Sequence, residues 1–174
     1  NMSHSQSHIR MNNISFIGMA GCGKSTLGSA VANKIASNFV DTDLLIEDKF
    51  KMSLEDVKNK FGYRFVRSAE EEAILSLNSS TKIISTGGSA VYSYKSMEHL
   101  RSFSKIVYID TPLETIIKRI GIGQERGLAV PNGLSIPEVY IERQPLYEKF
   151  AEVTLDGSRS IDELTKSIEK IINE

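Results

Sequence analysis

The sequence predicts an α/β protein in which a five-stranded parallel sheet lies between two layers of helices. Short apolar runs of strand length alternate along the chain with longer segments of helical periodicity, as in parallel sheets covered by helices on both faces. The runs are apolar at nearly every position, which is typical of strands buried on both sides. With 174 residues, 40% of them hydrophobic and 25% charged, the chain has the length and composition of one globular domain.

Five runs have the length and composition of buried strands. They cover residues 14–17, 38–40, 82–85, 105–109 and 152–155. Helical patterns lie between them, and a strand–helix–strand crossover within one sheet is right-handed and joins parallel strands. We therefore expect all five strands to run in the same direction.

Two of the expected helices carry apolar side chains along one face. Residues 25–37 place Leu27, Val31 and Ile35 at helical spacing, and residues 65–77 repeat the same kind of pattern. Side chains three and four residues apart lie on the same side of a helix. Both helices should therefore pack this face on the sheet.

Local capping patterns mark two further helices. Thr111 followed by Pro112 is typical of a helix N-cap with proline at the first helical position, and Gly121 ends that helix. Ser160, with Glu163 three residues later, forms a capping-box pattern at the start of the last helix. The last helix also carries one apolar stripe, which indicates that one side of it is buried.

Two segments lack this regular pattern. Residues 1–12 are polar and without periodicity, and we expect a disordered tail there. Residues 121–134 hold four glycines and a proline among few periodic apolar side chains, which predicts a mobile lid. The single folded domain should therefore cover residues 13–174.

Composition and charge exclude several classes of function. A formal net charge of −1 argues against a general nucleic-acid binder, which needs a surplus of Lys and Arg to neutralise phosphates. No apolar run approaches the roughly 20 residues that cross a bilayer, and the polar start of the chain lacks the apolar core of a secretory signal. A lone cysteine fits a reducing compartment. We expect a cytoplasmic protein, monomeric, that binds neither nucleic acid nor membrane.

One segment carries the strongest chemical signal in the chain. Residues 18–26 match the pattern G-x-x-x-x-G-K-[ST], and they follow an expected strand and open an expected helix. Backbone N–H groups of such a loop point at phosphate oxygens, and the helix N-terminus adds a favourable dipole. The sequence therefore predicts a phosphate loop for ATP. The expected contacts are Gly21, Cys22, Gly23, Lys24, Ser25 and Thr26.

We expect three side chains of this loop to behave differently from one another. Lys24 should bridge the outer phosphates and so act in catalysis. The Ser25 hydroxyl is the expected ligand of Mg²⁺, a small ion that takes oxygen ligands and shares the phosphates. The Cys22 side chain should face away from the phosphates, and we expect no redox role for it.

Two aspartates follow the second expected strand. Because the carboxyl ends of parallel strands meet at one edge of a sheet, Asp41 and Asp43 should lie beside the phosphate loop. Asp41 can hold Mg²⁺ through its water, while Asp43 can accept a hydroxyl proton and orient that oxygen toward the terminal phosphate. The alternative is that both carboxylates cap the next helix.

Further motifs lie beyond the aspartates. They are Ile46-Glu47, Phe65-Val66-Arg67-Ser68-Ala69-Glu70, Gly87-Gly88 and Glu142-Arg143-Gln144-Pro145-Leu146-Tyr147. Together with the phosphate loop and Asp41-Thr42-Asp43, they give the chain a resemblance to shikimate kinases of the nucleoside-monophosphate-kinase-like group, over nearly its whole length. The resemblance implies phosphoryl transfer from ATP to shikimate. It also implies that Asp43 binds the acceptor hydroxyls and that Arg67 and Arg143 bind its carboxylate.

The chemistry of the two arginines agrees with that implication. Two guanidinium groups that converge on one pocket offer paired donors in a plane, which suits a small carboxylate. The alternative is that each arginine forms an ion pair with a glutamate at helical spacing on its own segment. The candidate partners are Glu70 and Glu71 for Arg67, and Glu138 and Glu142 for Arg143.

Four other residues are expected at the edges of the site. Gly87 and Gly88 form either a plain tight turn or a place where the backbone approaches a ligand closely, and we favour the second interpretation. By the resemblance, Arg119 and the turn that contains Arg159 should lie beside the adenine, although both could be ordinary surface residues.

The chain departs from the family pattern at the lid and in the pocket wall. The family's lid carries an arginine followed by proline and leucine, whereas Arg126 is followed by glycine and leucine. We expect Arg126 to close over the phosphates and offset transition-state charge, with a solvated loop arginine as the alternative. Ser89 stands where the family has the third glycine of its turn, and Tyr63 stands where it often has a glutamate. Because of these changes, the resemblance does not identify the acceptor acid.

Three other functions use the same kind of phosphate loop. A kinase for another hydroxy acid, such as a gluconate-like sugar acid, would need the same pocket. A GTPase reads guanine with Asn-Lys-x-Asp, and the nearest candidate, Asn33-Lys34-Ile35-Ala36, lacks the aspartate. A regulator without chemistry would have no need of Asp43 and Lys24 together with two arginines. We therefore favour a kinase for a small anionic hydroxylated acid.

Overall fold

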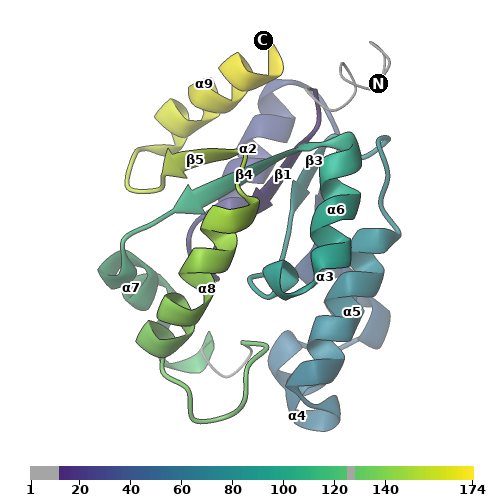
Figure 1. Ribbon diagram of the computed structural model, residues 1–174, viewed down its shortest axis with the longest axis vertical. Coiled ribbons are helices and arrows are strands. Elements are labelled where there is room, and N and C mark those ends of the chain that lie inside the picture. The colour runs from purple at the N-terminus through teal and green to yellow at the C-terminus, as the bar shows by residue number, and fades with distance from the viewer. Residues whose placement is uncertain (1–11, 125–127) are drawn as a thin grey trace.

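A parallel sheet forms the centre of the molecule, with helices on both of its faces (Figure 1). The structure is a computed structural model that describes residues 12–124 and 128–174. The strands are β1 (Ile14–Ile17), β2 (Phe39–Asp41), β3 (Ile83–Ser85), β4 (Lys105–Asp110) and β5 (Val153–Asp156). The helices are α2 (Lys24–Lys34), α3 (Thr42–Phe50), α4 (Leu54–Phe61), α5 (Tyr63–Leu75), η1 (Ala90–Tyr92), α6 (Tyr94–Phe103), α7 (Leu113–Gln124), α8 (Ile136–Phe150) and α9 (Ile161–Ile172). The predicted α/β architecture is confirmed.

The strand order places several strand ends at one edge of the sheet. The order is β2-β3-β1-β4-β5, and every neighbouring pair is parallel. Asp41, at the end of β2, lies opposite Ser85 at the end of β3. All five predicted strands are present, each within one residue of its expected bounds. Because all carboxyl ends meet at this edge, the phosphate loop after β1 lies near the aspartates after β2 and the glycine pair after β3.

Two layers of helices bury the strands. In Figure 1, α6 and α8 lie in front of the sheet and α2 lies behind it, where α9 packs against α2. Ile14, Phe16 and Ile17 of β1, the central strand of the five, are fully buried. Burial of one such side chain stabilises the fold by about 1.5–3 kcal/mol. None of the described helices is long and apolar enough to cross a membrane.

A second, smaller apolar cluster holds together the elements that follow β2. Val57, Val66 and Ala129 are buried in it, and Phe50 and Phe65 pack against them. It joins α3, α4 and α5, which lie together at the lower right of Figure 1. This cluster therefore supports the side of the molecule that faces the phosphate loop across the sheet edge.

The predicted start of α9 is correct and that of α7 is one residue early, while the predicted end at Gly121 coincides with a break in α7. The Ser160 hydroxyl accepts the backbone N–H of Glu163 at 3.2 Å, as the capping pattern predicted. At α7, the N–H of Ile116 is bonded to the Pro112 carbonyl at 3.1 Å, so the helix begins one residue later than expected. The Thr111 hydroxyl instead donates to the Cys22 carbonyl at 2.9 Å, which ties the end of β4 to the phosphate loop.

Parts of the expected lid are helical or buried. Helix α7 is broken at Gly121, whose φ of 64° and ψ of −179° are not helical, and the segment after the break continues to Gln124. Leu128, Ala129 and Val130 are buried. Residues 125–127 of the lid and residues 1–11 of the expected tail lie outside the described part of the chain.

Candidate active site

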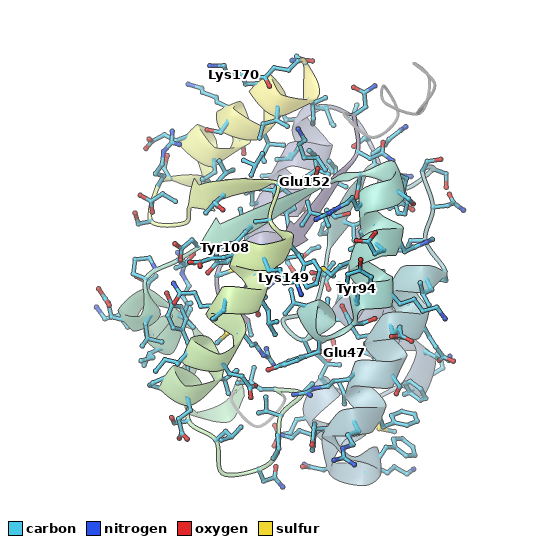
Figure 2. All side chains as sticks on the ribbon, viewed as in Figure 1. Glu47, Tyr94, Tyr108, Lys149, Glu152 and Lys170 are labelled. Atoms are coloured by element: carbon cyan, nitrogen blue, oxygen red, sulfur yellow. The ribbon has the colours of Figure 1, made fainter. Side chains whose placement is uncertain are left out.

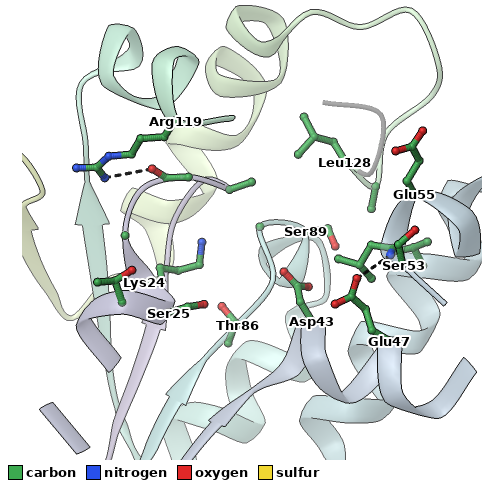
Figure 3. A pocket seen from close by; sticks show the side chains of 18 of the residues that line it. Lys24, Ser25, Asp43, Glu47, Ser53, Glu55, Thr86, Ser89, Arg119 and Leu128 are labelled. Atoms are coloured by element: carbon green, nitrogen blue, oxygen red, sulfur yellow. Dashed lines mark hydrogen bonds between the residues drawn. The ribbon is translucent and has the colours of Figure 1, made fainter. Parts of the chain in front are cut away.

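A cavity of about 920 Å³ opens at the carboxyl edge of the sheet. Figure 3 shows the phosphate loop with Lys24 and Ser25 on one side of it and Asp43 and Glu47 of α3 on the other. The start of α4, the turn after β3, Arg143 of α8 and the buried residues Leu128 and Ala129 also line it, together with Val66, Arg119 and Ile161. Its size is that of a small-molecule site.

The phosphate loop supplies one wall of the cavity. Of the predicted contacts, the residues that line it are Gly21, Gly23, Lys24, Ser25 and Thr26. Gly23 is the N-cap of α2 and has a φ of 103°, a left-handed conformation that only glycine adopts at little cost. This turn leaves the first N–H groups of α2 facing the cavity, where an anion can accept them. Cys22 is buried and does not line the cavity.

Lys24 rests against the loop that carries it. Its Nζ donates to the carbonyl oxygens of Gly18 at 2.6 Å and Met19 at 2.9 Å, and the side chain is nearly buried. The ammonium group thus lies at the base of the cavity with its charge solvated by backbone dipoles. A bound phosphate would offer it a stronger, charged partner within the same pocket.

Ser25 and Asp41 form the candidate magnesium site. The Ser25 hydroxyl donates to Asp41 Oδ2 at 2.5 Å. The other carboxylate oxygen accepts the N–H groups of Asp43 at 2.9 Å and Leu44 at 3.4 Å, so the alternative of a helix cap also holds for Asp41. In residues 12–124 and 128–174 no three His, Cys, Asp or Glu side chains form a metal cluster. A hydroxyl and a carboxylate still suit Mg²⁺, which keeps water and phosphate oxygens as its other ligands.

Asp43 faces the cavity from the first turn of α3. Burial, together with the nearby charge of Asp41, raises the pKa of Asp43 to about 6, although Lys24 opposes this shift. A carboxylate with a pKa near 6 is a better proton acceptor at neutral pH than one with the ordinary value of about 3.9. The position and the pKa of Asp43 therefore suit a group that takes a proton from a hydroxyl.

The glycine pair after β3 makes room for two charged side chains. A Cβ atom at Gly87 would stand 2.5 Å from Asp43 Oδ1, and one at Gly88 would stand 2.6 Å from Arg143 Nη1. Both distances are far below a van der Waals contact. The pair is thus a place of close approach, in which side chains of the site itself fill the space beside the backbone.

Arg143 is the largest charged side chain in the interior, with 1% of its surface exposed. Burial opposes its charge, but Tyr147 and Tyr92 beside it hold its pKa above the ordinary value. Its Nε donates to the Tyr92 hydroxyl at 3.3 Å, and its Nη2 has no partner among the described residues. Neither Glu138, which caps α8 through Ser135, nor Glu142 forms an ion pair with it in the described part of the chain.

Arg67 lies beside the main cavity and not in its wall. Its Nε donates to the Ala129 carbonyl at 2.8 Å, and its guanidinium group lies 3.8 Å from the centre of the Tyr92 ring and 4.9 Å from that of Tyr63. It lines a smaller cavity of about 260 Å³, which shares Ser89 with the main one. The expectation that Asp43, Arg67 and Arg143 line one cavity with Lys24 thus holds for the other residues but not for Arg67. Among the ion pairs of the described residues, none joins Arg67 to Glu70 or Glu71.

One buried acid of this site, Glu70, was not predicted from the sequence. Glu70 is 2% exposed, and it accepts hydrogen bonds from the Thr42 hydroxyl and the Gly87 N–H, both at 2.8 Å. Burial raises the pKa of Glu70 to about 8, and the charge of Asp43 adds to this shift. Its spacing from Arg67 suggested only a surface ion pair. The signal that could have found it is its position four residues after Val66, which places both side chains on the same buried face of α5.

The remaining arginines have different positions. Arg119 lines the cavity, and its Nη1 donates to the Gly21 carbonyl at 3.2 Å (Figure 3). Arg159 is exposed and pairs with Glu163 at 3.3 Å, and it is not among the described residues that line the cavity. Arg126 lies outside the described part of the chain.

Comparisons with known proteins agree with this geometry. The family model described as shikimate kinase matches residues 20–173. A shikimate kinase of Enterococcus faecalis is 32% identical over 167 residues, which cover 94% of this chain and 96% of that protein. Two solved structures share the fold. One is a shikimate kinase from Acinetobacter baumannii in complex with shikimate, 24% identical, with a TM-score of 0.82 and 97% of both chains covered.

The second solved structure is the shikimate kinase of Aquifex aeolicus, 28% identical, with a TM-score of 0.77. The superposition covers 92% of this chain and 96% of that one. Since the family model spans most of the sequence and a curated relative exceeds 30% identity over nearly all of it, the chain belongs to the shikimate kinase family.

Proposed function

We propose that this protein transfers the terminal phosphoryl group of ATP to a hydroxyl group of shikimate. Membership of the family makes it a phosphotransferase with an alcohol group as acceptor. The observation that carries the choice of an acid is the buried Arg143, whose Nη2 has no partner among the described residues. An unpaired buried charge is costly, and a small carboxylate in the cavity would relieve that cost.

In the proposed reaction, the residues of the cavity mainly position the reactants. The acceptor oxygen forms a bond to the γ-phosphorus as the bond to the bridging oxygen of ADP breaks, and the hydroxyl proton passes to Asp43. Lys24 exchanges its backbone carbonyls for the outer phosphates, and the N–H groups at the start of α2 hold the same oxygens. Ser25 and Asp41 would hold Mg²⁺, which when bound with the nucleotide neutralises phosphate charge.

Two arginines complete the proposal on the nucleotide side. Arg119 stands beside the phosphate loop and is assigned to the adenine, as the family resemblance implies. Arg126 is assigned to the transition-state charge, which a cation that closes over the phosphates would offset. The contact of Arg159 with Glu163 gives no support to a role at the adenine.

The decisive experiment is an acceptor screen with ATP and Mg²⁺. ADP release would be followed with shikimate, with quinate, with gluconate and without any acid, and the product of each positive reaction would be identified by phosphorus NMR as a phosphate ester. We expect the highest kcat/KM with shikimate and only slow hydrolysis without an acid. A higher kcat/KM with gluconate would replace shikimate by a sugar acid, and no ester with any acid would refute the kinase proposal.

A further inference from the structure

One aromatic side chain, Tyr92, contacts both of the arginines assigned to the acceptor. It is the last residue of η1, the short helix that follows the glycine pair. We propose that Tyr92 is a positioning residue that holds Arg67 and Arg143 together as one receptor for a carboxylate. The inference deepens the proposed function, and it rests on that function only for the identity of the acid.

The ring and the hydroxyl of Tyr92 make different contacts. The guanidinium carbon of Arg67 lies 3.8 Å from the ring centre, and that of Arg143 lies 5.4 Å from it. The hydroxyl accepts a hydrogen bond from Arg143 Nε at 3.3 Å and donates one to the Glu142 carboxylate. A single residue thus connects α5, which carries Arg67, to α8, which carries Arg143.

Two neighbouring guanidinium groups need such a connection because their charges repel. Burial lowers the pKa of Arg67; Tyr92 opposes this shift and Arg143 adds to it. The negative face of an aromatic ring attracts a cation, so the Tyr92 ring offsets part of the repulsion at Arg67. Without the ring, the more exposed Arg67 would turn toward water more easily, because only the hydrogen bond to Ala129 and the more distant ring of Tyr63 would still hold it.

The contacts of the two Nε atoms leave the terminal nitrogens for a ligand. Arg67 Nε is bonded to the Ala129 carbonyl, and Arg143 Nε is bonded to the Tyr92 hydroxyl. Arg143 Nη2 is buried and has no partner in residues 12–124 and 128–174. Each guanidinium group is therefore fixed at one nitrogen and offers the others, so that a carboxylate meets donors already in place. Binding to donors that are already ordered costs less entropy.

The Tyr92 hydroxyl also binds a carboxylate that would otherwise compete with the acid substrate for the arginines. Glu142 precedes Arg143 on α8, and it accepts the Tyr92 hydroxyl without forming an ion pair with Arg143. If the hydroxyl were removed, Glu142 would lose this partner and could turn to a nearby guanidinium group. An internal carboxylate would then compete with the acid substrate for the same donors.

The test separates the two contacts with two substitutions. Tyr92→Phe keeps the ring and removes the hydroxyl, and Tyr92→Leu removes both. We expect the KM for shikimate to rise about fivefold in the first variant and about thirtyfold in the second. The KM for ATP and kcat should change less than about twofold. The matched controls are Tyr94→Phe and Tyr94→Leu, since Tyr94 is 64% exposed on α6 (Figure 2) and should leave all constants unchanged.

Equal losses for both substrates, or equal effects of the two Tyr92 variants, would mean that Tyr92 only supports the fold and would overturn the proposal. A second measurement needs no substrate. Nitrogen-15 NMR of the arginine Nε–H groups should show a ring-current shift at Arg67 that persists in Tyr92→Phe and is lost in Tyr92→Leu. The Arg143 signal should move in both variants, because both lose its hydroxyl partner.

These two measurements keep the further inference apart from the proposed function. Unchanged arginine signals in Tyr92→Leu would overturn the positioning role, whatever acid the enzyme uses. The expected signals in an enzyme that does not phosphorylate shikimate would support the positioning role and reject only the choice of shikimate. The KM series would then be repeated with the acid that the acceptor screen identifies.

Discussion

The proposed nucleotide side and the proposed acceptor side of the cavity are built in opposite ways. One continuous segment, residues 18–26, provides most of the phosphate wall, largely through backbone N–H groups at the start of α2. The acceptor wall gathers side chains from α3, α8 and the turn after β3, with Arg67 of α5 beside it. The first wall is thus a local structure, whereas the second exists only when distant segments have packed.

The two sides also differ in the groups that create their electrostatic field. Backbone donors keep their positions whatever side chains surround them, and the helix dipole acts with them. On the proposed acceptor side, Asp43, Glu70 and Arg143 are buried ionisable groups. Burial is the main cause of the raised pKa values of the two acids; the charge of Asp43 raises the pKa of Glu70 further, and Arg143 opposes the shift at Asp43. Changes on this side should therefore affect the use of the acid far more than the binding of ATP.

The largest difference between the effect on turnover and the effect on ATP affinity is expected at Asp43. Asp43→Asn keeps the shape of the side chain and removes the proton acceptor, so turnover should fall by about a thousandfold while ATP affinity stays within about twofold. Steady-state kinetics and calorimetric titration with a nonhydrolysable ATP analogue measure the two quantities. Asp48→Asn, on the exposed side of α3, is the control. Turnover close to that of the unchanged protein would remove Asp43 from the mechanism.

A somewhat smaller effect is expected at Arg143. Arg143→Ala should lower kcat/KM for shikimate by about a hundredfold and leave the KM for ATP nearly unchanged, because a charged hydrogen-bonding partner of the acid is lost. Thermal unfolding must be measured alongside, since Arg143 is buried. Arg159→Ala provides an exposed arginine for comparison. Parallel losses for both substrates would contradict the division of the cavity into two sides.

The glycine pair offers a finer test. Gly88→Ala would put a methyl group 2.6 Å from Arg143 Nη1, and the arginine would have to move. We expect the KM for shikimate to rise about tenfold, with kinetics toward ATP preserved. Ser89→Ala, at the next position, should have a smaller effect. If Gly88→Ala raised the KM for ATP as much as that for the acid, the close approach would not be specific to the acceptor side.

The last test concerns the pH dependence of stability and not kinetics. The pKa of Glu70 is raised from 4.5 to about 8, so between these values the folded protein keeps a proton that the unfolded chain releases. The free energy of unfolding should therefore fall as the pH rises through this range, by at most about 1.4 kcal/mol per pH unit from this group. Glu70→Gln should remove this contribution to the slope in urea denaturation between pH 5 and about pH 8. The exposed Glu72→Gln should keep it, and equal slopes in all three proteins would contradict the raised pKa.

The same contrast explains how much could be predicted from sequence. The strands and the phosphate loop follow from local patterns, namely apolar runs and a motif between β1 and α2, and the strand bounds were correct within one residue. Helix α8 was not predicted as a unit, because Pro145 lies inside it and the exposed Ile141 weakens its apolar pattern. Helix α6 offered a usable signal in the Ser93 cap, which accepts the Ser96 N–H.

On the proposed acceptor side, sequence reasoning predicted that Asp43 and Arg143 lie at the cavity, but it did not predict their surroundings. Asp43 and Arg143 follow from motifs, and the structure brings both to the cavity. The burial of Glu70 and the contacts of Tyr92 depend on how α3, α5, η1 and α8 meet, which no spacing along the chain encodes. The Thr111 cap was wrong for a related reason: the hydroxyl finds a partner, the Cys22 carbonyl, that is close only in the folded chain.

The position of Lys24 has a consequence for inhibitors. Its ammonium group already has two carbonyl partners, from Gly18 and Met19, so a ligand gains from Lys24 only the difference between those contacts and its own. A neutral compound at the adenine end offers the ammonium group no charged partner, so its affinity must come from contacts with other residues. A compound with a phosphonate or similar anion at the loop would replace the carbonyl partners of the Lys24 ammonium group and gain a charged contact. Medicinal chemistry on this pocket should therefore begin from the anion and grow toward the acid site.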